Sequence, residues 1–362
     1  MEPFAALPEQ QEAKRLLTAA LREGPAHAYL LHGPAGTGKH RAAYAFAGAL
    51  LGDARRVDQG THPDLYVLEA LGEMIRIDAV RELRRDLHMR PFEADRRVYL
   101  ILSAHLLNED AADALLKDLE EPPPYAVIVL VANELGPLPP TIRSRCQLVP
   151  FRRLSEPAVR AWLEAEGPGL SPNEVTALAR VAAGRLDRAR RLLEPDSVES
   201  RRRLLEVARG PYADDDFEPA QAADVIVESS KRRAARAKEA AEAELEHVDL
   251  TAREAEQRVR RAGRGAERED LLASLEELAL WYRDLTAVGV GAESAVVHAD
   301  QLEALRADAV PERLAGAERA AELVRETWRA MEEFNVNASL TLEALFIRLR
   351  RELGAVRVAS SA

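Results

Sequence analysis

The stretch that decides the fold is Ala28-Tyr-Leu-Leu-His-Gly-Pro-Ala-Gly-Thr-Gly-Lys-His40. A short apolar run leads into a loop with Gly33, Gly38 and Lys39 at the G-x-x-x-x-G-K spacing of a phosphate-binding P-loop, and a helical pattern follows. Such a loop turns backbone N–H groups toward phosphate oxygens, and the next helix directs its positive end at them. The residue after the lysine is normally Ser or Thr, whose hydroxyl binds magnesium, but here it is His40. The sequence therefore predicts a nucleotide-binding loop that lacks one metal ligand.

The apolar runs around this loop predict a parallel α/β sheet. Helical patterns alternate with five expected strands, at residues 29–32, 65–68, 98–102, 126–132 and 147–149. The run at 126–132 is apolar throughout, which is typical of a strand buried on both faces. We expect a P-loop domain over residues 1–152, a helical lid over 153–207 and a helical collar over 208–362. The third lid helix is expected to run to about residue 193, and a linker that contains Pro211 and the aspartates at 214–216 is expected to follow it.

The collar pattern is interrupted by a charged segment at about 231–270. It holds eleven Lys/Arg and ten Asp/Glu, is rich in alanine and has few large apolar side chains. This composition favours a long solvated helix or hairpin inserted in the collar. A disordered arm and a partner-binding helix are the alternatives.

Composition narrows the class of protein. The 362 residues carry a formal net charge of −11 and only 5% aromatic residues, which argues against tight DNA binding by this chain alone and against a base-stacking platform. One cysteine, Cys146, excludes an internal disulfide and a cysteine-rich zinc site. No run approaches the roughly 20 apolar residues of a membrane span, and the N-terminus lacks a signal-peptide pattern. We expect a cytoplasmic protein without a membrane partner.

The end of the third strand departs from a working nucleotidase. In P-loop nucleotidases acidic residues hold magnesium and orient the attacking water. Here the strand ends in Leu102-Ser-Ala-His105, with no carboxylate. Glu109 and Asp110 fit the start of the next helix, where acids favour the helix dipole. His105 is interpreted as a structural histidine, and no metal site is predicted.

Local signals mark several helix starts. Ser171 and Glu174 have the spacing of a capping box, and Ser155 precedes an apolar helical pattern. Asp78 lies near the start of the helix expected after residue 75, where a carboxylate can cap it.

Several stretches together resemble the clamp-loader branch of the AAA+ proteins, and within it the delta-prime subunits of bacterial DNA polymerase III. The match follows the order of the chain and covers most of it. It consists of His27-Ala-Tyr-Leu-Leu-His-Gly-Pro34, Thr61-His-Pro-Asp-Leu65, Ile75-Arg-Ile-Asp-Ala-Val-Arg81, Ala114-Leu-Leu-Lys-Asp-Leu-Glu-Glu-Pro122, Pro140-Thr-Ile-Arg-Ser-Arg-Cys146 and Asn335-Val-Asn-Ala-Ser-Leu-Thr-Leu-Glu-Ala-Leu345. The Ser-Arg-Cys signature is the most specific of these, and the last stretch resembles the final collar helix.

The resemblance assigns roles to individual residues. Arg145 falls where the family places an arginine finger, which neutralises charge on the phosphates of ATP bound by a neighbouring subunit. A plain surface arginine is the alternative for Arg145, and Arg143 is a nearby competitor for the role. Asn133 falls at the position of a polar sensor, or is a loop residue. The lid's sensor arginine is replaced by Asp187, unless Arg185 or Arg188 substitutes for it. The candidate nucleotide-binding residues are Gly33, Gly36, Thr37, Gly38, Lys39, His40 and Asn133. They form a degenerate site, with an unoccupied site as the alternative.

The family's zinc module is replaced by a short polar linker, residues 52–60, without cysteine. The only histidine nearby, His62, is then expected to be structural. No zinc is predicted, no cofactor is required, and ATP binding is expected to be weak or vestigial.

The resemblance implies a delta-prime subunit without ATPase activity of its own. Such a subunit joins the gamma/tau ATPase and delta subunits in a hetero-oligomeric ring, and reaches the sliding clamp and primer-template DNA through that assembly. One rival is a catalytically active AAA+ ATPase, such as a gamma/tau-type motor subunit or a related helicase loader. Another is a scaffold that is held by its collar and contributes no arginine finger.

Overall fold

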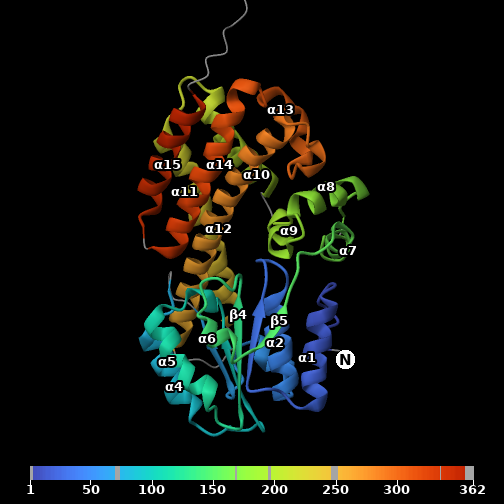
Figure 1. Ribbon diagram of the computed structural model, residues 1–362, viewed down its shortest axis with the longest axis vertical. Coiled ribbons are helices and arrows are strands. Elements are labelled where there is room, and N and C mark those ends of the chain that lie inside the picture. The colour runs from blue at the N-terminus through green and yellow to red at the C-terminus, as the bar shows by residue number, and fades with distance from the viewer. Residues whose placement is uncertain are drawn as a thin grey trace, which may run out of the picture. The chain divides into compact units, whose positions relative to one another are not determined.

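The computed structural model describes residues 3–69, 74–167, 169–194, 197–245, 252–334 and 336–354. Its contacts divide the chain into two units, residues 1–193 and 194–362 (Figure 1). Each unit has hydrophobic core clusters of its own.

The first unit is built on a five-stranded parallel sheet with strand order β2-β3-β4-β1-β5. The strands are β1 (Ala28–His32), β2 (Leu65–Leu68), β3 (Arg97–Ile101), β4 (Ala126–Ala132) and β5 (Gln147–Pro150). All five predicted strands are confirmed to within one residue at each end. β1 lies between β4 and β5, with Leu30 opposite Leu130 and Leu148, so the P-loop leaves the sheet near its centre.

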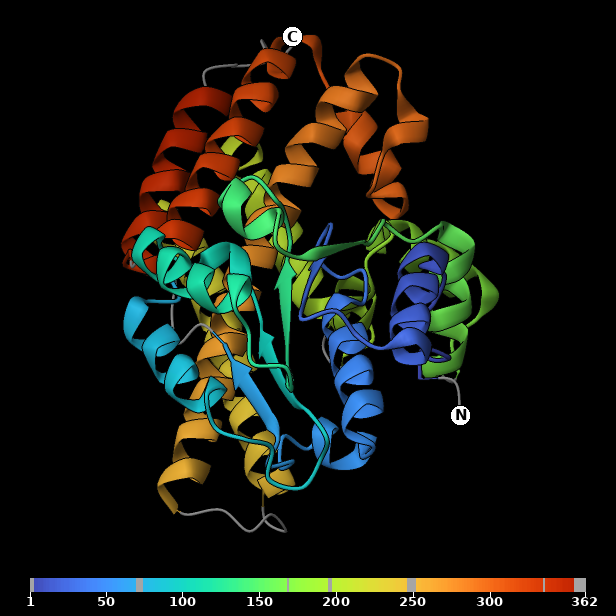
Figure 2. The same ribbon diagram turned by 60° about the horizontal axis from the view of Figure 1, so that its bottom comes forward.

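Helices cover both faces of this sheet (Figure 2). On one face, α1 (Gln11–Glu23) and α2 (Lys39–Leu51) bury Leu17 and Phe46 against alternate strand residues such as Leu31 and Val129. On the other, α4 (Ile77–Leu87) and α5 (Glu109–Glu120) supply apolar side chains to a second cluster. Because both faces are covered, β4 is buried along its whole length, as its apolar sequence predicts.

Three short helices occupy the loops of this unit: α3 (Ala54–Asp58), η1 (Ala104–Leu106) and α6 (Pro140–Arg143). The first is a difference from the sequence prediction, which treats residues 52–60 as a linker. Asp53 accepts a hydrogen bond from the Arg56 N–H at 3.0 Å, and Val57 is fully buried. The local cap and the burial of one valine together explain why this polar segment is helical.

The remainder of the first unit is a small helical bundle, formed by α7 (Glu156–Glu166), α8 (Pro172–Ala182) and α9 (Leu186–Leu192) around a core that includes Trp162. The capping box of Ser171 and Glu174 is present, and Ser155 caps α7. The prediction for Asp78 was wrong: it lies inside α4 and pairs with Arg81 at 3.2 Å instead of capping the helix.

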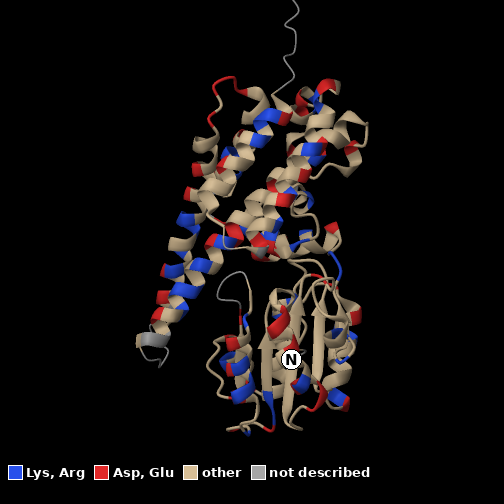
Figure 3. Ribbon diagram, turned by 60° about the vertical axis from the view of Figure 1, so that its left-hand side comes forward, with Lys and Arg blue, Asp and Glu red and all other residues tan. Residues whose placement is uncertain are grey.

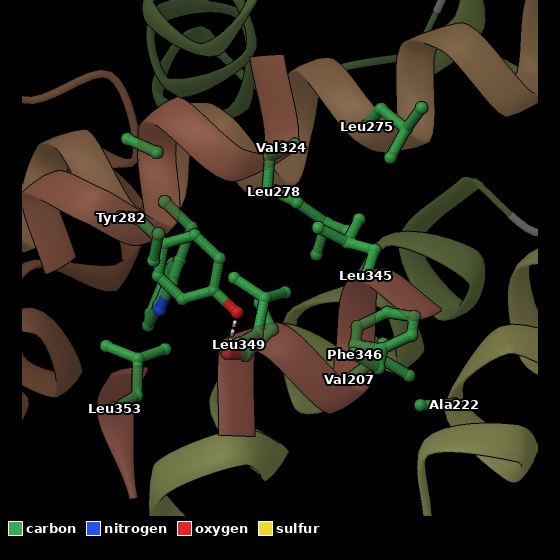
Figure 4. Close-up of a cluster of buried hydrophobic side chains, with 14 of the residues drawn as sticks. Val207, Ala222, Leu275, Leu278, Tyr282, Val324, Leu345, Phe346, Leu349 and Leu353 are labelled. Carbon is green, nitrogen blue, oxygen red and sulfur yellow. Dashed lines mark hydrogen bonds between the residues drawn. The ribbon is translucent and has the colours of Figure 1, made fainter. Parts of the chain in front are cut away.

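The second unit is helical. Its long helices are α10 (Ser197–Ala213), α11 (Pro219–Leu245), α12 (Ala252–Gly289), α14 (Pro311–Glu333) and α15 (Ala338–Leu353), with the shorter η2 (Glu293–Ala295), η3 (Ala299–Gln301) and α13 (Leu302–Asp308). Figure 4 shows its core, in which Leu345 and Phe346 of α15 lie among side chains of the other helices. At one edge of this core the Tyr282 hydroxyl donates a hydrogen bond to the Ala208 carbonyl at 2.8 Å.

The boundary between the units differs from the one expected at residue 207. The sequence suggests a linker after residue 193 because of Pro211 and the run of aspartates at 214–216, but α10 occupies residues 197–213. Leu205, Val207 and Ala208 of this helix belong to the core of the second unit. Pro211 lies inside the last turn of this helix, where it cannot donate the backbone hydrogen bond to the carbonyl four residues earlier.

The charged segment at 231–270 continues two of these helices. Residues 231–245 form the end of α11 and residues 252–270 the start of α12, and the two helices pack against each other over much of their length. The connection at 246–251 lies outside the described residues, as does Asn335 before the last collar helix.

No helix within the described ranges is both long and apolar enough to cross a membrane.

Candidate functional site

The P-loop connects β1 to α2 in a conformation that needs glycine. Gly33, Gly36 and Gly38 have φ angles of 137°, 69° and 95°, which side chains rarely adopt. A Cβ at Gly33 would lie 2.1 Å from the Phe151 carbonyl oxygen. The glycine spacing noted in the sequence therefore reflects both backbone conformation and the close approach of the segment after β5.

Lys39 and Thr37 bond to the loop itself. The Lys39 ammonium donates hydrogen bonds to the carbonyl oxygens of Gly33 and Pro34 at 2.7 and 2.6 Å, and only 4% of the residue is exposed. The Thr37 hydroxyl donates to the Pro34 carbonyl at 2.8 Å. Burial lowers the pKa of Lys39 to about 8. The cation that would reach the outer phosphates is thus held by the protein's own oxygens.

The lid closes onto the loop through Asp187. The Leu186 N–H donates to the Gly36 carbonyl at 2.8 Å, and a Cβ at Gly36 would lie 1.8 Å from the Asp187 carboxylate. Arg185 donates to the two carboxylate oxygens at 3.1 and 2.7 Å. Burial alone raises the pKa of Asp187, but the hydrogen bonds and charge of Arg185 hold it below its usual range. A negative charge therefore lies against the loop, where the resemblance places an arginine.

His40 occupies the exposed position after the lysine. Crowding by surrounding protein atoms and the neighbouring Lys39 charge lower its pKa, so its imidazole is neutral at pH 7. It supplies no hydroxyl oxygen of the kind that magnesium prefers at this position of a P-loop.

The end of β3 brings together two of the residues singled out in the sequence. His105, in η1, accepts a hydrogen bond from the Asn133 backbone N–H through Nδ1 at 3.4 Å. Glu109 and Asp110 lie in the first turn of α5, as predicted, behind a cap in which Asn108 accepts from the Ala111 N–H. Neither acid stands at the strand end. The residues present at this strand end thus do not supply the carboxylate ligands of a magnesium-bound nucleotide.

His62 has a structural role. It is 4% exposed, and its Nδ1 accepts a hydrogen bond from the Asp64 N–H at 3.1 Å. The buried Asp64 carboxylate accepts three backbone N–H groups, from Phe92, Glu93 and Ala94, at 2.6–2.9 Å. In the part of the chain that the structure describes, no group of three His, Cys, Asp or Glu side chains is placed to hold a metal ion.

Arg145 lies at the surface, directly after α6. Its guanidinium pairs with Glu120 at the end of α5 and donates to the Thr141 carbonyl at 3.0 Å, with 34% of the side chain exposed. Cys146 packs at the edge of the sheet core, and burial raises the pKa of its thiol to about 12. The thiol is therefore protonated and packs as an apolar side chain, as expected.

Comparisons with known proteins match the part of the chain that contains the P-loop and Arg145. A family model described as DNA polymerase III, delta subunit matches residues 9–155. The delta' subunit of DNA polymerase III from Pseudomonas aeruginosa is 34% identical over 196 residues, which cover 50% of this chain and 60% of the relative. The Bacillus subtilis delta' subunit is 29% identical over 206 residues, which cover 54% of this chain and 62% of the relative. The Bacillus subtilis tau subunit is 31% identical over 203 residues, which cover 51% of this chain and 36% of the relative. The chain spans less than two thirds of the length of each of these relatives.

The first 155 residues of this chain are therefore similar to subunits of DNA polymerase III. The P-loop and Arg145 both lie within the matched residues. Delta' and tau subunits match at similar identity, so the choice between them depends on the chemistry of the site.

Two residues that sequence reasoning missed, Gln10 and Glu9, also contact the P-loop and the lid. The Gln10 side chain donates to the Arg152 carbonyl at 2.6 Å and to the Thr37 carbonyl at 3.4 Å, and it accepts from the Arg152 N–H at 3.0 Å. Glu9 accepts hydrogen bonds from the N–H and hydroxyl of Ser155 at 3.0 and 2.5 Å. The N-terminal segment is thereby tied to the P-loop and to the lid. No local pattern could have shown this, because the partners are 142 and 146 residues apart in the sequence.

Proposed function

We propose that the chain is a delta-prime subunit of the DNA polymerase III clamp loader, which hydrolyses no ATP itself and supplies Arg145 to ATP on a neighbouring subunit. The observation that carries the proposal is the closure of the P-loop by its own chain. Lys39 is bound to loop carbonyls and the Asp187 carboxylate lies against Gly36.

This closure opposes nucleotide binding for an electrostatic reason. A polyphosphate at the loop would meet the carboxylate of Asp187, whose negative charge is maintained by Arg185. Lys39 would have to exchange two short hydrogen bonds for the phosphates. With His40 after the lysine and no carboxylate at the end of β3, magnesium would also lack ligands. We expect ATP binding to be weak or vestigial.

Arg145 is suited to act on another subunit. A finger must be held in place before the neighbour arrives and must then exchange its partner for phosphate. The pair with Glu120 lies at the surface, where such ion pairs contribute about 0–1 kcal/mol, so the exchange costs little. An arginine finger raises the rate of nucleotide hydrolysis by about 10³–10⁵.

The second unit offers a surface for assembly. On α15, Leu340 and Ile347 are 65% and 55% exposed and, seven residues apart, share one face of the helix. Exposed apolar side chains at helical spacing support packing against helices of other subunits. We propose gamma/tau and delta subunits as these partners, and contact with the sliding clamp and primed DNA through the assembly.

The finger is tested in the reconstituted complex with a gamma/tau ATPase. Arg145→Ala should lower DNA-stimulated ATP hydrolysis at the site next to this subunit by at least about 10³, measured with the other sites of the ring inactivated. Arg143→Ala is the matched control, two residues away, and should retain activity. Full activity of the Arg145→Ala complex would reject the finger and leave a scaffold role.

The motor-subunit alternative is favoured by the similarity to tau. It predicts magnesium-dependent ATP turnover by the isolated chain, lost in Lys39→Ala. Our proposal predicts no ATP turnover by the isolated parent chain or by Lys39→Ala. It also predicts that the two proteins differ little in their binding of labelled ATP. Turnover by the isolated parent chain would overturn the proposal.

A further inference from the structure

The hairpin of α11 and α12 carries exposed cations that have no acidic partner among the residues that the structure describes. Lys231 and Lys238 lie on α11, and Arg260, Arg261 and Arg264 lie on α12; we call these five residues the basic band. All five are exposed, and within the described ranges none forms an ion pair or a side-chain hydrogen bond. The Lys238 stem packs over Gly263, which brings the cations of the two helices onto one stretch of the hairpin. Figure 3 shows basic residues on both arms before the grey tip.

The positive charge is local. Residues 231–238 hold five Lys/Arg and no Asp/Glu, and residues 257–266 hold four Arg and no Asp/Glu, in a chain of net charge −11. Other cations of the hairpin are neutralised; Arg233, between Lys231 and Lys238, pairs with Glu194 at 2.7 Å and faces Asp270 at 3.8 Å. The five residues of the basic band differ from Arg233 in having no such acidic partner among the described residues.

We propose that the basic band binds the phosphodiester backbone of duplex DNA. The contact is independent of the P-loop and of Arg145, and it goes beyond the proposed function by assigning direct DNA contact to the hairpin. A partner with regularly spaced negative charge is needed, and duplex DNA carries one per about 1.7 Å of its axis. Lys231 and Lys238 alone span about 10 Å along their helix, enough for several phosphates.

The side chains between the cations favour DNA over an acidic protein. Protein interfaces rely on buried aromatic or large apolar anchors. Residues 231–270 contain no Phe, Trp or Tyr, and the exposed residues beside the cations include Ala235 and Gly265. Cations without apolar anchors suit contacts to phosphates, which position DNA without reading its bases. The lack of aromatic residues also argues against stacking on single-stranded bases.

The test measures binding of the full-length chain to a labelled duplex of about 30 base pairs at about 50 and 200 mM salt by fluorescence anisotropy. The variant is Arg260→Gln, Arg261→Gln and Arg264→Gln. The control is Arg15→Gln, Arg22→Gln and Arg325→Gln, which removes the same charge from exposed arginines that are also unpaired within the described part of the chain. Circular dichroism confirms folding, and Lys231→Gln with Lys238→Gln provides a second variant on the other helix.

We expect the parent and control to bind with a steep salt dependence. The hairpin variant should bind at least about tenfold more weakly at low salt, with a log–log salt slope flatter by about 2 to 3. No binding by the parent, an equal loss in the control, or no loss in either hairpin variant would overturn the proposal. So would a hairpin variant that loses binding to a polyglutamate peptide and keeps its affinity for DNA, because the partner would then be an acidic protein.

Discussion

At the residue scale, Asp187 has the largest effect on the P-loop. Its carboxylate fills the space beside Gly36 and brings a negative charge to a loop built for phosphates. Its position depends on Arg185, two residues before it, and on the Arg188 N–H, which donates to it at 2.8 Å. Residues 185–188, at the start of α9, thus hold a carboxylate against the loop.

Substitution of Gly36 tests this closure. Gly36→Ala should destabilise the first unit by about 1–3 kcal/mol, because the φ angle is positive and the new Cβ would overlap Asp187. Urea unfolding measures the change. The double variant Gly36→Ala with Asp187→Ala relieves the overlap but keeps the strained φ. Its loss of unfolding free energy should therefore be smaller than the sum of the losses in the two single variants. Strict additivity would show that the lid does not contact the loop.

His298 is a second residue whose neighbours determine its behaviour. It is fully buried, and its ring nitrogens lie 2.8 Å from Asp284 and 3.0 Å from Glu277. Burial alone lowers the pKa of His298, but the two carboxylates raise it overall above its usual 6.5. Arg201 and Arg283 also face these carboxylates, at 3.3 and 3.5 Å.

A raised folded-state pKa makes stability depend on pH with a definite sign. Protonated His298 stabilises the fold fully below about pH 6.5, and this stability is lost as pH rises through the folded value. Each unit of the rise contributes about 1.4 kcal/mol. Urea unfolding at about pH 6 and pH 9 measures the free energy of unfolding. Between these pH values it should fall more in the parent than in His298→Gln, because glutamine cannot titrate. Equal losses in the two proteins would contradict the assignment.

At the element scale, two glycines inside long helices have opposite surroundings. Gly265 of α12 has no atom within 4 Å of a Cβ built on it, whereas a Cβ at Gly316 of α14 would lie 2.6 Å from the Glu352 carbonyl oxygen of α15. The first glycine weakens its helix without a packing role, and the second permits close approach of two helices.

These surroundings predict opposite effects of the same substitution. Gly265→Ala should stabilise the second unit by about 0.5–1 kcal/mol, because alanine loses less backbone entropy in a helix. Gly316→Ala should destabilise it by about 1–3 kcal/mol, because α14 and α15 must move apart. Thermal unfolding followed by circular dichroism measures both. Unfolding temperatures that both rise or both fall in the two variants would refute the packing argument.

At the scale of the whole molecule, the position of α10 decides where the second unit begins. Arg201 in this helix pairs with Asp300 at 2.5 Å and with Glu277 at 3.3 Å, and Leu205 and Val207 join the core. The second unit therefore includes residues that the sequence assigns to the lid.

A pair of fragments tests this boundary. Residues 194–362 produced alone should be helical and unfold cooperatively, because their core is complete. Residues 208–362 lack the first half of α10 and should melt at a lower temperature or remain partly unfolded. If the shorter fragment were equally stable, the boundary near residue 207 would be the better one.

The sequence by itself determined the parallel sheet, the P-loop and most of the helices. Alternating apolar runs, glycine spacing and caps such as Ser171 with Glu174 act over a few residues, so they can be read locally. The helix at residues 197–213 was missed because Pro211 and the acidic run resemble a linker, while its stability comes from packing against distant helices.

Only the tertiary structure decided what surrounds the P-loop. The replacement of an arginine by Asp187 was visible in the sequence, but its contact with Gly36 joins residues about 150 positions apart. The tertiary structure also showed the contact of Gln10 with the loop and of Glu120 with Arg145, and that the basic band has no acidic partner among the described residues. Long-range contacts depend on how the elements pack. Local patterns could therefore predict a degenerate nucleotide site, and the fold was needed to show which of the chain's own groups close it.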